Sequence, residues 1–206
     1  MRYIFVHGLG QDSSSWQETI SYMGETAEIL CPDLFELLEG KELTYKNLYV
    51  AFSEYVAAIS GTVVIIGLSL GAVLALNFAI DHSEKVQSLV LISPQYRMPK
   101  FLLTVQYNIF RFMPESSFRK LGSSKDAFIL LTKSMVDLDF SKDVKRISCN
   151  TLILCGNRDK VNKRASKRLA KYIPKAEFHE IEDAGHEMNE DNPEKLATAI
   201  VGFLWG

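Results

Sequence analysis

One serine in this chain lies between two glycines in a pattern that suits a nucleophile. Gly67-Leu68-Ser69-Leu70-Gly71 fits G-x-S-x-G and lies between the apolar run 63–66 and the helical segment 72–79. The serine would then occupy a strained strand-to-helix turn, where the glycines let strand and helix approach closely. The positive end of the following helix would favour developing negative charge. The alternative is a glycine-rich turn with a capping serine.

A serine hydroxyl needs a base to take its proton, and the base needs an orienting acid. Of the four histidines, His186 follows the strand candidate 177–181 in a small-residue loop. Functional residues are concentrated in such loops at the carboxyl ends of parallel strands, so His186 is the predicted base. His82 lies in a polar helix end, and packing is the plainer interpretation of His179, which falls within the strand candidate itself.

The predicted acid is an aspartate that follows another strand. Asp159 closes the sequence Gly156-Asn157-Arg158-Asp159, directly after the strand candidate 151–154. The alternative for Asp159 is a helix cap, since helical residues begin soon afterwards. Asp137 and Asp139 are the alternative acids.

The first apolar run ends in a second glycine-rich turn, His7-Gly8-Leu9-Gly10. Glycines there would free backbone N–H groups to face a substrate oxygen, as an oxyanion hole requires. We expect the N–H groups of Leu9 and Leu70 to be that pair. The alternative is a tight turn that uses glycine for its geometry alone.

The elements that must position these residues alternate along the chain. Short apolar strands separated by helices predict one α/β domain: a three-layer sandwich with a mainly parallel sheet and helices on both faces. The predicted strands are 3–6, 28–31, 62–66, 88–92, 151–154 and 177–181, and the predicted helices are 14–23, 45–59, 70–81, 163–172 and 193–205.

The segment 95–142 interrupts this alternation and is predicted to be a helical cap, or lid, over the site. Its apolar and aromatic residues occur at helical spacing, and it is rich in cations. The alternative is an ordinary packed helical pair with a solvated basic face. The cations of 96–125 are Arg97, Lys100, Arg111, Arg119, Lys120 and Lys125, opposed by Glu115 alone.

Composition excludes several classes of protein. With 206 residues, 47% of them apolar, the chain suits one globular domain rather than a disordered or collagen-like chain. The net charge of −2 and the lack of a strongly basic stripe argue against a nucleic-acid partner. Three cysteines cannot all pair, so Cys31, Cys149 and Cys155 are interpreted as reduced core residues of a cytoplasmic chain.

Neither a targeting segment nor a membrane span is expected. The apolar run 3–6 is too short for a secretory signal. The segment 55–80 has no charged residue, but it divides into a β-branched strand, a glycine turn and an Ala/Leu-rich helix.

Taken together, these motifs resemble those of the α/β-hydrolase superfamily over nearly the whole chain. His7-Gly8-Leu9-Gly10 resembles its oxyanion loop, and the segment 67–71 resembles its nucleophile elbow. The segments 156–159 and 185–194 resemble its acid-bearing and histidine-bearing loops. The resemblance implies Ser69 as nucleophile, His186 as base and then acid, and Asp159 as its orienting partner. It also places 95–142 at the family's usual cap position, whereas Ser69 argues against dehalogenase and epoxide-hydrolase activities.

Two departures from the family pattern have consequences. The first strand begins almost at Met1, with no preceding hairpin, so we expect six parallel strands with 28–31 at an edge beside 3–6. That edge could be covered or could pair with a second copy, so a homodimer is one alternative. The segment 31–35 stands where relatives often have a glycine-bearing loop, and the apolar Leu34, Phe35, Leu37 and Leu38 are expected to shape a binding pocket there. His7, Gly8, Leu34 and Phe35 are accordingly the predicted substrate-binding residues.

The expected function is that of a cytoplasmic serine hydrolase, which cleaves a small carboxylic ester or thioester through a Ser69 acyl-enzyme. Its expected partner is a small molecule with an apolar acyl or alkyl group, although the basic residues of the cap leave an anionic head group open. No metal or organic cofactor is implied. The alternatives are a C–C bond lyase or synthase with the same triad, like the menaquinone-pathway synthase, and a non-catalytic binding module.

Overall fold

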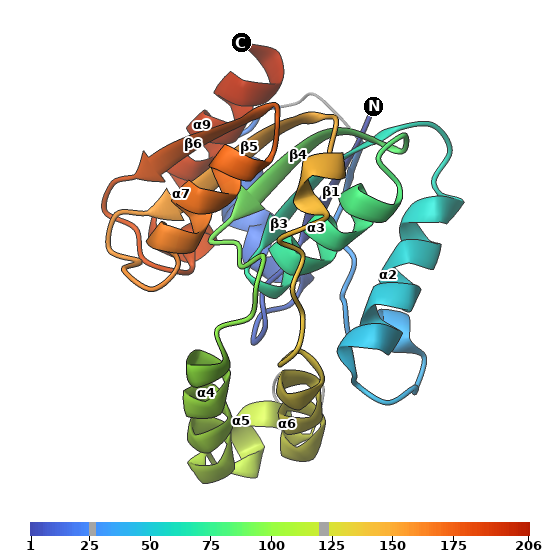
Figure 1. Ribbon diagram of the computed structural model, residues 1–206, viewed down its shortest axis with the longest axis vertical. Helices are drawn as coiled ribbons and strands as arrows, with labels where there is room; N and C mark the ends of the chain where they lie inside the picture. Colours follow the sequence, from blue (N-terminus) through green and yellow to red (C-terminus); the bar gives the residue numbers. More distant parts are fainter. Residues whose placement is uncertain (25–27, 120–123) are drawn as a thin grey trace.

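Six parallel strands form the centre of the protein in a computed structural model that describes residues 1–24, 28–119 and 124–206 (Figure 1). The strand order is β2-β1-β3-β4-β5-β6, and every neighbouring pair is parallel. This confirms the predicted fold class and the edge position of the second strand. The strands are β1 (Arg2–Val6), β2 (Glu28–Leu30), β3 (Val63–Leu68), β4 (Val86–Ile92), β5 (Asn150–Gly156) and β6 (Ala176–Ile181).

Both faces of the sheet are buried because successive side chains of its apolar strands point to opposite sides. Ile4 and Ile65 pack into the hydrophobic cluster on one face. Their chain neighbours Phe5 and Ile66 pack into the cluster on the other face. All four side chains are fully buried, which explains why β1 and β3 read as continuous apolar runs.

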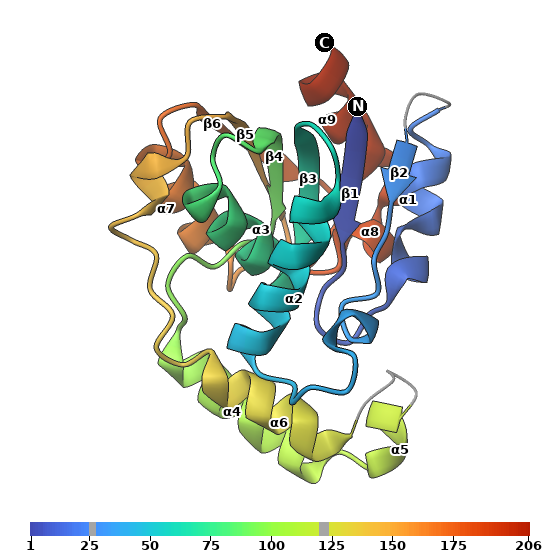
Figure 2. The same cartoon turned by 90° about the vertical axis from the view of Figure 1, so that its right-hand side faces the viewer.

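Helices cover each face, so that the molecule has three layers (Figure 2). Side chains of α2, α3 and α7 belong to the first cluster, and side chains of α1, α8 and α9 belong to the second or pack against it. The α-helices are α1 (Gln17–Ser21), α2 (Tyr45–Ala58), α3 (Leu70–Asp81), α4 (Lys100–Phe112), α5 (Glu115–Arg119), α6 (Lys125–Ser134), α7 (Lys163–Tyr172), α8 (Met188–Asp191) and α9 (Pro193–Trp205). Short 3₁₀ helices are Ser13–Trp16, Glu36–Leu38 and Val144–Arg146.

The chain between β4 and β5 leaves the sheet and forms α4, α5 and α6 below it (Figure 1). This is the segment 95–142 for which the sequence predicts a cap. Lys120, one of its predicted surface cations, lies outside the described residues. None of the helices in the described ranges is long and apolar enough to cross a membrane.

Several local predictions are wrong in detail. The predicted helix 14–23 is a 3₁₀ turn followed by the short α1. β6 is an edge strand whose residues are half exposed rather than continuously buried. His179 is therefore not a packed core residue: its side chain is 56% exposed and its Nε2 lies 3.5 Å from Glu177 Oε2. Cys31 follows β2 and is half-buried, whereas Cys149 and Cys155 are buried, and all three are free thiols.

Candidate active site

Ser69 occupies the single residue between β3 and α3, in a backbone conformation that non-glycine residues rarely adopt. Its φ is 53° and its ψ is −110°. Its N–H donates to Ile92 O of β4 at 2.9 Å, which fixes the turn to the neighbouring strand. Such strain persists only where the surrounding structure enforces it, and it concentrates at functional sites.

The two glycines of the motif are required by close packing. A Cβ on Gly67 would lie 2.5 Å from the carbonyl oxygen of Gly71. A Cβ on Gly71 would overlap the carbonyl oxygen of Val6 at the end of β1. The small residues thus let α3 start directly against β1 and β3, which presents the hydroxyl of Ser69 above the carboxyl end of the sheet.

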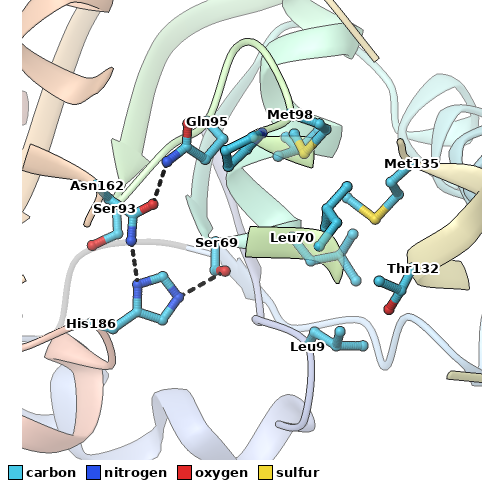
Figure 3. Close-up of a pocket in the computed structure, with 13 residues that line it drawn as sticks. Leu9, Ser69, Leu70, Ser93, Gln95, Met98, Thr132, Met135, Asn162 and His186 are labelled. Carbon is cyan, nitrogen blue, oxygen red and sulfur yellow. Dashed lines mark hydrogen bonds between the residues drawn. The ribbon is translucent and has the colours of Figure 1, made fainter. Parts of the chain in front are cut away.

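The structure brings Ser69, His186 and Asp159 together from three loops. Figure 3 shows the ring of His186 next to Ser69. His186 Nε2 lies 2.9 Å from Ser69 Oγ, and His186 Nδ1 lies 3.0 Å from Asp159 Oδ2. If Nδ1 carries the proton, it donates to the carboxylate, and Nε2 is free to accept from the hydroxyl. This is the geometry that a serine nucleophile, its base and an orienting acid require.

Asp159 is an ionised carboxylate in a nearly buried place, with 6% of its surface exposed. Burial alone would raise its pKa, but hydrogen bonds from His186 and Asn162 outweigh burial and hold the pKa below its usual range. Asn162 supplies two of the donors: its backbone N–H lies 3.1 Å from Oδ1 and its amide nitrogen 2.8 Å from Oδ2. The carboxylate therefore keeps its charge, which is what orientation of a neutral histidine needs.

Sequence reasoning missed Asn162 and the residue that fixes it. The side-chain nitrogen of Asn162 also lies 3.0 Å from His186 Nδ1 (Figure 3). The side-chain oxygen of Asn162 accepts a hydrogen bond from Gln95 Nε2 at 2.5 Å. Gln95 thus orients the amide so that its NH₂ group faces the aspartate. The sequence contained only a weak signal, because an aspartate shortly before a helix often accepts the backbone N–H three residues later, as Asp159 does from Asn162.

Two backbone N–H groups are available next to Ser69. Leu70 and Leu9 both line the pocket that contains the serine. Neither N–H has a hydrogen-bond acceptor among the described residues. They are therefore the groups that could hold a developing oxyanion.

A buried amide network, also missed from the sequence, supports the first of these loops. Gln11 Oε1 accepts from Gly8 N at 3.3 Å, and Gln11 Nε2 donates to Asn189 Oδ1 at 3.2 Å. Asn189 in turn donates to Ser15 O at 3.1 Å. The turn after β1 is thereby tied to α8, the helix that follows His186.

The pocket itself is small and mostly apolar. Its volume is about 180 Å³. The polar side chains other than Thr132 lie together at the end that contains Ser69 and His186 (Figure 3). Apolar side chains come from α3, α4, the segment before α4 and the residue that follows α6. The apolar lining consists of Leu9, Leu70, Val73, Met98, Pro99, Leu103 and Met135.

The prediction of substrate-binding residues is corrected for His7 and Leu34, whereas Gly8 lies against Ser69. His7 and Leu34 are both fully buried, and the lining of the pocket includes none of His7, Gly8, Leu34 and Phe35. His7 Nε2 accepts from Leu34 N at 3.0 Å and Nδ1 lies 2.9 Å from Gly8 O, so the ring joins two loops as a neutral imidazole. Burial, which outweighs the hydrogen bond to Gly8 and nearby carboxylates, lowers the pKa of His7.

The side chains of the two alternative acids are exposed, and each forms an ion pair with a cationic side chain. Asp137 accepts from Lys100 at 2.8 Å, and Asp139 lies 3.2 Å from Arg97. His186 contacts Asp159 instead. In the described ranges, no group of three or more His, Cys, Asp or Glu side chains is arranged to hold a metal ion.

Comparison with known proteins agrees with this architecture. The sequence pattern of the alpha/beta hydrolase family matches residues 3–199, so the chain belongs to that family. A curated relative, the biotin biosynthesis bifunctional protein BioHC of Teredinibacter turnerae, is 28% identical over 94 residues. That match covers 44% of this chain, and the chain spans only 16% of the length of that relative.

Solved structures share the fold at low sequence identity. MenH from S. aureus has a TM-score of 0.82 at 16% identity, with 99% of this chain and 93% of that chain covered. A thermophilic esterase from Thermogutta terrifontis has a TM-score of 0.78 at 21% identity, covering 99% and 89%. The enol-lactonase from Burkholderia xenovorans has a TM-score of 0.80 at 15% identity, covering 100% and 91%. These similarities establish the fold, and they do not select a substrate.

Proposed function

We propose that the protein is a serine hydrolase that cleaves a small carboxylic ester or thioester through an acyl-enzyme on Ser69. The observation that carries this proposal is the continuous contact from Ser69 Oγ to His186 and on to Asp159, at 2.9 and 3.0 Å. A serine in a strained turn with an oriented imidazole beside it is an activated nucleophile.

The steps follow from this arrangement. Ser69 Oγ attacks the substrate carbonyl while His186 Nε2 takes its proton. The N–H groups of Leu9 and Leu70 hold the oxyanion, and His186 then gives the proton to the departing oxygen or sulfur. A water molecule, deprotonated by His186, attacks the acyl-enzyme and releases the acid. Asp159 stays ionised and stabilises the imidazolium throughout.

The size of the pocket indicates a short apolar acyl group. An apolar cavity of roughly 150 Å³ is enough to hold benzene. The volume of about 180 Å³ beside Ser69 therefore suits acyl chains of about the same size. Because Met98, Leu103 and Met135 come from the segment 95–142, we propose that this segment is the cap and that it sets acyl length.

Hydrolysis of nitrophenyl esters tests the proposal. In the series of acetyl, butyryl, octanoyl and dodecanoyl esters, the rate of hydrolysis should be highest for the short acyl groups. Ser69→Ala and His186→Ala should each lower kcat by on the order of 10⁴-fold or more. His82→Ala, at the far end of α3, is the matched control and should keep full turnover. Full turnover in Ser69→Ala would overturn the proposal.

The acid is tested separately. Asp159→Asn should lower kcat by on the order of 10⁴-fold through the wrong histidine tautomer. Asp137→Asn and Asp139→Asn should stay near wild type. The reverse pattern would assign the acid to Asp137 or Asp139 and would leave the assignment of the nucleophile unchanged.

The same site would also serve a C–C bond lyase or synthase, and MenH and an esterase match this chain at similar TM-scores. Accumulation of an acyl-enzyme with simple esters favours the hydrolase, and its absence together with an intact site favours the lyase. A non-catalytic binding module would bind esters without turning them over.

The remaining expectations are also proposals. Three free thiols suit a reducing, cytoplasmic compartment. The chemistry above needs no metal or organic cofactor. The edge strand β2 offers backbone groups through which a second copy could pair, and gel filtration with light scattering would decide between monomer and homodimer.

A further inference from the structure

A second hollow adjoins the active-site pocket. Its volume is about 450 Å³, and it lies between α7 and the chain that leads into α4. Gln95, Met98 and Pro99 line both spaces, so they form the wall that the two share. A substrate bound at Ser69 would therefore find this hollow beside it.

Four cations line the hollow, and its described lining contains no acidic residue. Arg97 and Lys100 come from the chain before and at the start of α4, while Arg164 and Arg168 come from α7. Arg164 and Arg168 have no carboxylate oxygen within 4.0 Å among the described residues. Two guanidinium groups without a partner, one helical turn apart, are arranged to take an anion.

The other two cations are held only loosely. Arg97 lies 3.2 Å from Asp139, with the two side chains 72% and 44% exposed. Lys100 lies 2.8 Å from Asp137, with the side chains 72% and 81% exposed. Exposed ion pairs of this kind contribute little to stability, so an incoming anion can replace the carboxylates at little cost.

The positive charge continues along α7. Residues 160–176 hold seven Lys or Arg and no acid, so the rest of the chain has a net charge of −9. A further hollow on this helix is lined by cations alone: Lys160, Lys163, Arg164, Lys167, Arg168 and Lys171. The expectation that the chain has no strongly basic stripe is thus wrong for α7. The net charge of −2 hid the stripe, because acids elsewhere balance it.

Apolar side chains lie between the cations. Val161 is 55% exposed, and together with Ala165, Met98 and Pro99 it lines the same hollow. An exposed valine within a cationic surface suits a ligand with an uncharged arm that ends in an anionic group. A simple inorganic anion would leave this apolar surface uncovered.

We propose that this hollow binds a phosphate-bearing leaving group, so that the substrate is an acyl ester or thioester of a phosphorylated alcohol or thiol. The inference rests on the proposed function of Ser69. The acyl chain enters the apolar pocket, the carbonyl lies at Ser69, and the arm of the leaving group passes Gln95 and Met98 to reach Arg164 and Arg168.

The reaction on a thioester balances without a further reactant except water. Ser69 Oγ forms a bond to the carbonyl carbon, the C–S bond breaks, and the sulfur leaves with the proton that His186 took from Ser69. Water then supplies the hydroxyl group of the carboxylic acid and returns the proton to Ser69 through His186.

A matched set of thioesters tests the inference. Butyryl coenzyme A, butyryl phosphopantetheine and butyryl N-acetylcysteamine share the acyl group and the thioester, and differ in the phosphates of the leaving group. We expect kcat/KM to be at least about tenfold higher for the two phosphorylated substrates, because the guanidinium groups would form charge-assisted hydrogen bonds with the phosphate. About 1 M salt should remove the advantage, because it shortens the screening length to about 3 Å. Coenzyme A and phosphopantetheine then distinguish a nucleotide from a single terminal phosphate.

Variants locate the site. Arg164→Ala with Arg168→Ala should raise KM for butyryl coenzyme A by about tenfold or more and leave the N-acetylcysteamine thioester within about twofold of wild type. Lys145→Ala with Arg146→Ala removes the same charge from an exposed 3₁₀ turn outside the hollow and should change neither substrate. Equal effects of the two double variants would mean that net charge alone attracts the substrate, and would overturn the inference.

Binding gives a readout that does not depend on turnover. Calorimetry with coenzyme A should show binding to wild type and to Ser69→Ala, and at least about tenfold weaker binding to the Arg164→Ala and Arg168→Ala double variant. Hydrolysis of the uncharged thioester with no preference for phosphate and no binding of coenzyme A would overturn this inference and leave the proposed function intact. Binding without any Ser69-dependent hydrolysis would support the anion site and overturn the proposed function.

Discussion

The amide nitrogen of Asn162 lies 3.0 Å from Nδ1 of His186, beside the oxygen of Asp159 that faces the same nitrogen. A protonated Nδ1 cannot accept from an amide, so the NH₂ group of Asn162 serves the carboxylate rather than the ring. Gln95 holds the amide in that orientation from its other side. Asn162 is thus a positioning residue: it fixes the carboxylate that fixes the histidine.

Asn162→Ala should therefore lower kcat by about 10- to 100-fold, the range expected for hydrogen bonds to a charged group, while KM changes little. Steady-state kinetics on a nitrophenyl ester measures both constants. Asn157→Ala, an exposed asparagine in the same loop, is the matched control. A rise in KM with kcat unchanged would place Asn162 in substrate binding instead, and thermal melting checks that each variant is folded.

Two helical glycines should respond oppositely to the same substitution. Gly71→Ala should destabilise the protein by about 1–3 kcal/mol or more, since the new Cβ would overlap Val6 O. In α9, a Cβ on Gly202 would have no other heavy atom within 4 Å. Gly202→Ala should therefore stabilise the protein by about 0.5–1 kcal/mol. Urea unfolding measures both free energies. A neutral Gly71→Ala would mean that α3 does not pack as closely on β1 as the structure has it.

The sequence predicted the strands and the edge position of β2 next to β1. Strands such as β1 and β3 are buried on both faces, so each forms a continuous apolar run that is easy to recognise. It placed β6 within one residue of its observed bounds but predicted the burial of β6 and of His179 wrongly, because β6 is an edge strand with several exposed positions. It also predicted the candidate nucleophile, base and acid, since glycine-flanked turns after strands are local features.

The supporting contacts could not be predicted in the same way. Gln11 and Asn189 are 178 positions apart and meet only when the sheet is assembled. The basic face of α7 was hidden by net charge. Leu34 was predicted to shape a binding pocket, yet its side chain is fully buried in the hydrophobic core.

The buried His7 should make stability depend on pH. Its pKa is lowered on folding, chiefly by burial, so the unfolded chain takes up a proton first as pH falls. Its stabilising contribution is therefore complete above the unfolded value of about 6.5 and is lost below it. Between about pH 7.5 and pH 5, the free energy of unfolding of His7→Gln should fall less than that of the wild type, although it is lower than that of the wild type at pH 7.5. The exposed His179→Gln is the control, and equal losses in wild type and His7→Gln would contradict the assignment.

Covalent labelling of Ser69 tests the central claim most directly. A fluorophosphonate reacts only with a serine whose hydroxyl is activated by a neighbouring base. Peptide mass spectrometry should find the adduct on Ser69 in the wild type, none in Ser69→Ala, and labelling slowed by on the order of 10⁴-fold in His186→Ala. An adduct on another serine, or labelling of Ser69 at an unchanged rate without His186, would contradict the account.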